Sequence, residues 1–294
     1  MKRLFIINPK SGKNNKADEL EHTIKTQFDL ADIVFTKAAG HAKKLAADAV
    51  KQNYEQVIVA GGDGTVNEAA SSLVGTKTAL GIIPIGSGNG LAREIACPLD
   101  NLQKACNNIY MAKPVLCDAG KANGEYFFNV AGIGLEATIA HAFARVQTRG
   151  MFPYFKIGFE QVLKYKAPHV EVWADDKSLI YLNPITLVFA NGKQYGSNFK
   201  IAPKASLTDG KLDMVYVKQS PLWKLVLGLP NFFKPNLSSV KLTQARQVKK
   251  AVITAQGKFF YHLDGEPKEA TEKLEIEVLP KAIYLLSVDR TAHK

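Results

Sequence analysis

The sequence predicts an α/β domain with a parallel sheet, followed by a domain built mainly of β-strands. Up to about residue 119, short apolar runs alternate with helical patterns, as in parallel sheets with flanking helices. Glycine-rich loops follow several of these runs. From residue 120 onward, short strand-like segments separated by turn residues favour a β-sandwich or a partly closed barrel. We therefore expect domains at 1–119 and 120–281, with 282–294 returning to the first domain.

The composition fits a two-domain protein with anionic partners. A chain of 294 residues exceeds a typical single domain, and its net charge of +11 favours phosphate-bearing ligands or an anionic membrane surface. Cys97, Cys106 and Cys117 lack CxxC spacing, so we expect reduced thiols in the cytoplasm. No apolar run approaches the ~20 residues that span a bilayer. We expect a cytoplasmic protein that associates with membranes at most peripherally.

The spacing of apolar residues predicts the elements of the first domain in order. Strands are expected at 4–7, 31–35, 57–60 and 80–83, and helices at 17–28, 41–50 and from about 65 onward. A polar or glycine-rich segment follows each strand, namely Asn8 to Gly12, Thr36, Gly61 to Thr65, and Gly86 to Asn89. Because ligands bind beyond the carboxyl ends of parallel strands, these four segments predict one binding site.

The loop Gly61-Gly62-Asp63-Gly64-Thr65 is the strongest single indication of that site. It joins a buried strand to a helix, and glycines there allow backbone N–H groups to approach a phosphate. The helix N-terminus adds partial positive charge, and Asp63 could hold a metal ion. A tight turn whose glycines only relieve backbone strain is the alternative interpretation.

In the second domain we expect a series of strands and one helical insertion at about 135–166. The strands are expected at 114–119, 126–130, 170–173, 185–190, 211–217, 248–254, 259–263 and 274–279, with a last one at 282–288. Two segments, 151–163 and 222–233, place aromatic residues beside lysines. This pattern is typical of membrane-contacting surfaces, although core packing explains either segment equally well.

Two acidic turns of the second domain are candidates for chemistry. Asp209-Gly210 is a hairpin signal, and Asp209 with nearby backbone carbonyls could bind a hard cation. Asp264-Gly265-Glu266 puts two carboxylates at the end of a strand. One could act as a general base while the other orients it or holds a metal. A plain turn would also explain Asp264-Gly265, and the preceding His262 is most simply a structural residue.

Taken together, these motifs make the sequence similar to the soluble lipid kinase superfamily of diacylglycerol kinases and sphingosine kinases. The resemblance covers nearly the whole chain and includes Ala202-Pro203 besides the loops above. It implies a Rossmann-like nucleotide-binding domain, a C-terminal β-sandwich domain and an active site in the interdomain cleft, with ATP and Mg²⁺ bound. NAD kinases share the Gly61 to Thr65 signature, whereas the final Asp-Gly-Glu is typical of the lipid kinases.

The resemblance also implies roles for individual residues. Glu266 matches the proton acceptor, with Asp264 supporting it, and Asp63 would hold magnesium directly or through water. Ser206, Asp209 and Lys211 match a magnesium site, to which Ser206 and Lys211 contribute backbone oxygens. The implied nucleotide contacts are Asn8, Lys10, Ser11, Gly12, Thr36, Gly61, Gly62, Asp63, Gly64, Thr65, Val66, Asn67, Glu68, Gly86, Ser87, Gly88 and Asn89.

The expected reaction is transfer of the γ-phosphate of ATP to the primary hydroxyl of a lipid such as diacylglycerol or a sphingoid base. Asn89 is followed by Gly90-Leu91-Ala92-Arg93, which resembles the sphingosine and ceramide kinase branch. An NAD kinase, or a non-catalytic module that binds phosphate or membrane, is the alternative. The expected partners are ATP, a lipid acceptor and an anionic membrane surface, and a homodimer is left open. No nucleic acid is expected, because the basic residues do not cluster with aromatic ones.

Overall fold

The chain forms two compact units in the computed structural model, which describes residues 1–12, 17–28, 31–144, 161–162, 164–175, 178–195, 200–218 and 243–288. The first unit comprises Met1–Ala119, Ser206–Asp209 and Leu279–Lys294. The second comprises Gly120–Ala205 and Gly210–Val278. Among the helices in the described ranges, none is long and apolar enough to cross a membrane.

A parallel sheet with the strand order β2-β1-β3-β4 forms the centre of the first unit. Its strands are β1 (Arg3–Ile7), β2 (Ala31–Phe35), β3 (Gln56–Gly61) and β4 (Ala79–Pro84). The last part of the long strand β14 (Glu266–Ser287) pairs parallel with β4, opposite Leu80. Every residue of β3 and β4 is buried, as expected for parallel strands that are covered on both faces.

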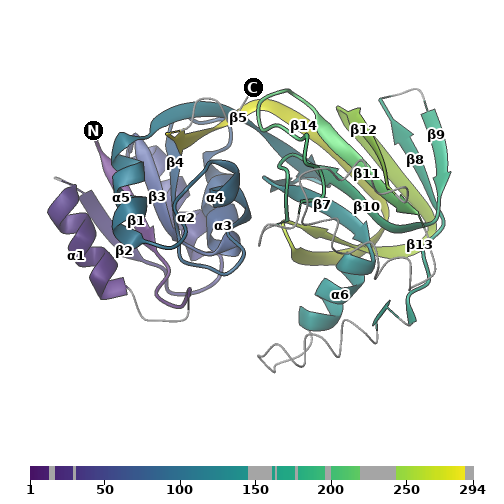
Figure 1. Ribbon diagram of the computed structural model, residues 1–294, viewed down its shortest axis with the longest axis horizontal. Helices are drawn as coiled ribbons and strands as arrows, with labels where there is room; N and C mark the ends of the chain where they lie inside the picture. The colour runs from purple at the N-terminus through teal and green to yellow at the C-terminus, as the bar shows by residue number, and fades with distance from the viewer. Residues whose placement is uncertain are drawn as a thin grey trace. The chain divides into compact units, whose positions relative to one another are not determined.

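Helices cover both faces of this sheet, as Figure 1 shows. They are α1 (Ala17–Gln27), α2 (His41–Lys51), α3 (Asp63–Leu73), α4 (Gly90–Glu94) and α5 (Leu102–Met111). The buried side chains of α1 and α5 share one apolar core with Phe5, Ile58 and Ile83 of the strands. Helices α2 and α3 pack against each other on the opposite face. The predicted α/β class is therefore confirmed.

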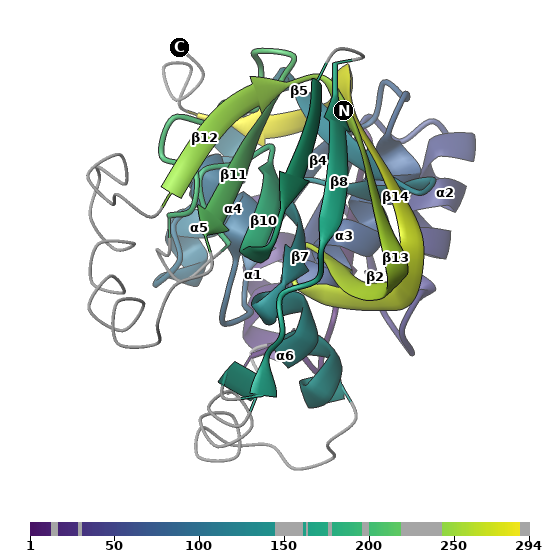
Figure 2. The ribbon, with the colours of Figure 1, turned by 90° about the vertical axis from the view of Figure 1, so that its right-hand side faces the viewer.

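The second unit is the predicted β-sandwich. Its strands are β5 (Lys113–Ala122), which begins in the first unit, β6 (Glu125–Phe127), β7 (Val130–Gly134), β8 (Val170–Ala174), β9 (Ser178–Leu182), β10 (Pro184–Ala190), β11 (Leu212–Lys218), β12 (Thr243–Val248), β13 (Lys250–Leu263) and the first part of β14. Strands β7, β10, β11 and β12 form one antiparallel run. Strand β13 pairs with β8, then with β7, and along β14, beside which it runs in Figure 2.

Several predicted strand boundaries were wrong. The strand expected at 126–130 is divided into β6 and β7, because the amides of Phe128, Asn129 and Val130 donate to the carboxylate of Asp264. The strands expected at 248–254 and 259–263 are both parts of β13, whose pairing register shifts between Thr254 and Phe259. Likewise, β14 contains the strands expected at 274–279 and 282–288.

Four elements were not predicted, namely α4, α5, β9 and β12. Helix α5 had a readable signal, because the Asn101 side chain caps it by accepting from the amide of Lys104 at 2.8 Å. Strand β12 lies at the end of its run and carries mainly polar residues, so it lacks the apolar alternation that marks a half-buried strand.

The helical insertion begins as predicted with α6 (Leu135–Ala144). Its expected continuation lies mostly outside the described residues. Segment 222–233 lies wholly outside them, as does segment 151–163 apart from Gln161 and Val162.

Candidate active site

The segments that follow β1, β2 and β3 meet at the carboxyl edge of the first unit's sheet. Asn8 ties the first and third together, since its amide donates to Ala60 O (2.9 Å) and its Nδ2 donates to Thr65 Oγ1 (2.9 Å). Its Oδ1 accepts from the amide of Lys10 at 3.0 Å. Thr36, beyond β2, donates its amide to Ile7 O at 2.8 Å. The structure therefore brings the predicted segments together through their backbones.

The loops after β3 and β4 touch backbone to backbone. A Cβ added at Gly86 would lie 2.5 Å from the Cα of Gly62, and one at Gly12 would lie 2.7 Å from Ile85 O. Such distances exclude a side chain at either position unless the backbone moves. Close packing between loops therefore requires glycine at Gly86, and at Gly12 it adds to a φ of 88° that already favours glycine.

Asp63 links α3 to the loop after β4. Its Oδ2 accepts from the amide of Asn89 (2.8 Å) and its Oδ1 from that of Gly90 (2.6 Å). A Cβ at Gly88 would lie 2.5 Å from Oδ2, so this loop folds closely over the carboxylate. In this arrangement both oxygens of Asp63 hold the loop in place. The adjacent Asn89 Oδ1 is buried and has no hydrogen-bond partner among the described residues.

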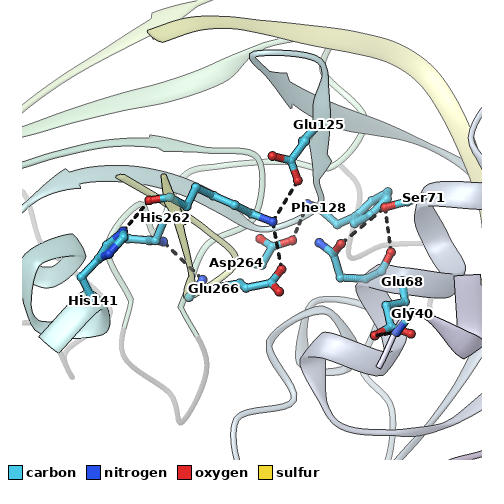
Figure 3. A network of polar contacts seen from close by, with 12 residues as sticks. Gly40, Glu68, Ser71, Glu125, Phe128, His141, His262, Asp264 and Glu266 are labelled. Carbon is cyan, nitrogen blue, oxygen red and sulfur yellow. Dashed lines mark hydrogen bonds and ion pairs between the residues drawn. The ribbon is translucent and has the colours of Figure 1, made fainter. Parts of the chain in front are cut away.

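Three residues of the predicted nucleotide set, Val66, Asn67 and Glu68, have contacts within the first unit. Val66 is buried, and Asn67 O accepts from Ser71 Oγ at 2.8 Å. Glu68 caps α2, accepting from the amides of Gly40 (2.8 Å) and Ala42 (3.2 Å), and its position beside Gly40 is visible in Figure 3. By contrast, Lys10, Gly12, Gly64 and Ser87 are exposed and can reach a ligand.

This sheet edge is suited to bind phosphate. The first amides of α3 have no partner within the helix and carry partial positive charge, and Gly64 there leaves open space where a side chain would stand. Beside the loops lies a cavity of 230 Å³, lined by Ser11, Gly12, Ile85, Gly86 and residues 98–102, among others. The edge therefore offers donors for phosphate groups and an adjoining hollow for the rest of a ligand.

The predicted metal-binding turn is divided between the two units. Ser206 and Asp209 belong to the first, in which Leu207 O accepts from the amide of buried Asp118 at 2.6 Å. Lys211 belongs to the second, and its ammonium donates to Gln247 at 3.1 Å. Within the described ranges, no three or more His, Cys, Asp or Glu side chains form a metal cluster. The Asp209 carboxylate is nevertheless the type of ligand that Mg²⁺ prefers. Mg²⁺ typically takes one or two carboxylates and fills its coordination shell with phosphate and water.

Asp264 and Glu266 belong to the hairpin that joins β13 to β14. Residues 264 and 265 have φ angles of 50° and 84°, as a tight two-residue turn requires. The Asp264 carboxylate accepts from the amides of Phe128 (2.8 Å), Asn129 (2.8 Å) and Val130 (2.9 Å), and Figure 3 shows it facing Phe128. Asp264 is thus occupied in fixing the turn to the segment before β7.

Glu266 differs from Asp264 in both exposure and partner. Its side chain is 65% exposed and accepts from the Lys268 ammonium at 3.1 Å. Lys268 is only 17% exposed and also donates to Glu125 at 2.9 Å. Partial burial alone would lower the pKa of Lys268, but its bonds to Glu125 and Glu266 outweigh this and raise the pKa. Sequence analysis missed Lys268, although residues two apart on a strand share a face.

Two buried titratable groups lie near this turn and carried no motif in the sequence. His262 Nδ1 accepts from the amide of Gly265 at 3.2 Å, and burial lowers the pKa of His262 to about 4. Burial raises the pKa of Glu136 to about 8. A Cβ at Gly132 would lie 2.6 Å from His262 Nε2 and 2.9 Å from Glu136 Oε1, so the two groups are neighbours. At neutral pH both are uncharged.

A parallel α/β unit with glycine-rich loops at its carboxyl edge and a β-sandwich unit with a fixed Asp-Gly-Glu turn match the architecture that the sequence resemblance implies for two-domain kinases. Residues 2–122 match the family model for the diacylglycerol kinase catalytic domain. Residues 129–287 match that for the YegS C-terminal NAD kinase beta sandwich-like domain. The chain therefore belongs to the diacylglycerol kinase and YegS-like lipid kinase family. The resemblance noted in the sequence, and the prediction of a kinase, are confirmed.

Individual relatives match over nearly the full chain. The diacylglycerol kinase of Bacillus subtilis (strain 168) is 30% identical over 283 residues, covering 90% of this chain and 90% of that protein. The "Probable lipid kinase YegS-like" protein of Pectobacterium atrosepticum is 28% identical over 298 residues, covering 96% and 94%. The crystal structure of a diacylglycerol kinase from Bacillus anthracis str. Sterne has a TM-score of 0.74 at 23% identity, covering 97% of this chain and 96% of that one. This last likeness shows the shared fold.

Proposed function

We propose that the protein transfers the γ-phosphate of MgATP to the primary hydroxyl of a lipid acceptor, such as diacylglycerol or a sphingoid base. Family membership supports a lipid acceptor, since relatives are named diacylglycerol kinase or lipid kinase. The proposal of a lipid acceptor thus rests on family membership. A closer relation to sphingosine and ceramide kinases, suggested by the residues after Asn89, remains a prediction. Peripheral binding to an anionic membrane belongs to the same proposal, because the acceptor is a lipid and the net charge is +11. The oligomeric state is left open.

The first unit supplies the nucleotide-binding residues in this proposal. The amides at the start of α3 and the exposed Lys10, Gly64 and Ser87 bind the ATP phosphates. Asp63, or the turn with Ser206, Asp209 and Lys211, would hold Mg²⁺, whose positive charge would stabilise the transferring phosphoryl group.

Glu266 is the general base in this proposal, and one observation carries that choice. Both acids of the turn are candidates, but the Asp264 carboxylate already accepts three backbone amides. Glu266 is exposed, and its carboxylate pairs with the ammonium of Lys268. Glu266 accepts the proton as the acceptor oxygen forms its bond to the γ-phosphorus, while the bond to the bridging oxygen breaks and ADP leaves. Asp264 supports the reaction by fixing the turn.

Glu266→Gln tests this assignment, because the amide keeps the size of the side chain but cannot accept the proton. General base catalysis is worth about 10²–10⁴-fold, and we expect kcat to fall by that factor with KM for ATP and the melting temperature unchanged. Transfer of radiolabelled phosphate from ATP to diacylglycerol, ceramide and sphingoid bases in mixed micelles measures it. Glu272→Gln, at an exposed position of the same strand, is the matched control. Near-normal activity of Glu266→Gln would refute the assignment.

The same assay addresses the NAD kinase alternative. The family model of the second unit is itself described as NAD kinase-like, so NAD⁺ belongs in the acceptor panel. We expect phosphate transfer to lipid and none to NAD⁺. Transfer to NAD⁺ alone would replace the lipid kinase proposal.

A further inference from the structure

We propose that Lys268 is a positioning residue for Glu266: Glu125 holds its ammonium, and the ammonium in turn fixes the orientation of the Glu266 carboxylate. This inference rests on the proposed function, in which Glu266 is the base. It assigns a role to a residue outside the Asp264 to Glu266 motif and to its partner on β6.

The contacts at the ammonium are the first support. Lys268 Nζ lies 3.1 Å from Glu266 Oε2 and 2.9 Å from Glu125 Oε2. Glu125 and Glu266 are 54% and 65% exposed, while the lysine between them is 17% exposed. An exposed glutamate samples several rotamers and loses conformational entropy when one is selected. A sheltered cation beside it restricts that choice before substrate binds.

Lys268 is itself held at its backbone. It pairs with Tyr261 across the β13–β14 hairpin, and its carbonyl accepts a hydrogen bond from His141 Nε2 of α6, drawn in Figure 3. The His141 ring stacks on Phe260, with ring centroids 4.2 Å apart and an interplanar angle of 29°. The lysine is thus anchored at its main chain by α6 and at its ammonium by β6.

An ordinary surface ion pair on the same strand offers a contrast. Lys273 Nζ lies 2.5 Å from Glu275 Oε1, and the two side chains are 58% and 59% exposed. Pairs of that kind, between two exposed side chains, contribute little to stability. Lys268 instead contacts two carboxylates from different strands and is largely buried. We therefore expect it to fix the orientation of the Glu266 side chain.

Lys268→Met tests the role, because methionine keeps most of the stem and removes the charge. We expect kcat to fall by about 10- to 100-fold, as for small misplacements of a reacting group, with KM for ATP unchanged. Lys268→Arg should recover most of the activity, since its guanidinium can still bridge both carboxylates. Lys273→Met is the matched control and should be fully active. A fully active Lys268→Met enzyme would overturn the inference. Thermal melting checks that a loss of activity does not come from a loss of folding.

A double-mutant cycle separates positioning from direct contact with the phosphate. If Lys268 acts only through Glu266, Glu266→Gln with Lys268→Met should be no slower than Glu266→Gln alone. If the kcat losses of the two single variants multiply in the double variant, or if KM for ATP rises in Lys268→Met, the ammonium contacts the nucleotide. Either result would overturn the inference. Failure of the base assignment is a separate result, because it would show as an active Glu266→Gln enzyme.

Discussion

The two sets of candidate site residues are held in place by opposite means. In the first unit, the loops are fixed by backbone contacts so close that no Cβ fits at Gly12 or Gly86. In the second unit, Glu266 is exposed and depends on side-chain charges for its orientation. Binding triphosphate needs a preformed set of amides, whereas proton transfer needs one side chain at one position.

This difference predicts how each region responds to substitution. Backbone contacts leave a substituted residue no room, so changes there should affect folding and binding together. Charge contacts can be weakened without steric conflict, so changes at Glu266 or Lys268 should reduce catalysis while the fold persists. The variants below test this contrast, in order of decreasing effect.

Gly86→Ala should have the largest combined effect. Its Cβ would lie 2.5 Å from the Cα of Gly62 and 3.0 Å from Asn89 Oδ1. Forced overpacking typically costs about 1–3 kcal/mol, and displaced loops should reduce kcat/KM for ATP by at least about 10²-fold. Urea denaturation and steady-state kinetics measure both. Retention of wild-type stability would contradict close packing of these loops.

Gly64→Ala sharpens the contrast, since it lies in the same signature but no atom lies within 4 Å of its added Cβ. Alanine in place of a helical glycine should stabilise the protein by about 0.5–1 kcal/mol. If the open space holds a phosphate, ATP affinity should nevertheless fall by about tenfold or more. Equilibrium binding of ATP, alongside denaturation, tests this. Unchanged affinity would mean that the phosphates lie elsewhere. Gly257→Ala, also open but distant in sequence, is the control.

Much of the first unit could be predicted because local patterns there coincide with the fold. Strand β2 was predicted at its observed bounds, and α2 to within one residue, since apolar spacing reports burial on a regular sheet. The second unit was predicted less well. The ends of its strands depend on residues distant in the sequence. For example, the amides of Phe128 to Val130 donate to the Asp264 carboxylate, and this divides one expected strand into two.

For the candidate site, the motif residues could be named but not their contacts. The sequence marked Asp63 and Glu68 as ligand residues, and only the structure shows one holding the loop after β4 and the other capping α2. Lys268, Glu125 and Glu136 carried no motif, because their roles depend on long-range neighbours. His262 was expected to be structural, and its buried bond to Gly265 agrees with that.

Glu136→Gln should change the pH dependence of stability. Burial raises the pKa of Glu136 in the folded protein to about 8 from 4.5. Below pH 4.5 both states are protonated; as pH rises toward 8, only the unfolded chain ionises, so the folded state loses stability. Glutamine does not titrate, so the variant should gain on the order of 3–4 kcal/mol relative to wild type between pH 5 and pH 8. His262, whose pKa burial lowers to about 4, costs stability in the opposite direction, as the pH falls from 6.5 toward 4.

Urea denaturation at several pH values measures that gain, and Glu272→Gln is the control for loss of an exposed carboxylate. A difference between Glu136→Gln and wild type that is constant with pH would mean that Glu136 ionises normally in the folded protein. Activity is not expected to follow the same curve unless the neighbouring turn moves.

Glu68→Ala should have the smallest effect. This variant distinguishes two roles for Glu68, capping of α2 and binding of the nucleotide. The carboxylate accepts from the amides of Gly40 and Ala42 at the start of α2, and loss of a helix cap costs about 0.5–2 kcal/mol. If capping is its role, stability should fall by that amount while KM for ATP stays within about twofold. A rise in KM with stability unchanged would instead make Glu68 a nucleotide ligand. Because Glu68 lies in α3 and caps α2, the first outcome would extend the contrast between the units: α3 too is held by backbone amides, here those of Gly40 and Ala42.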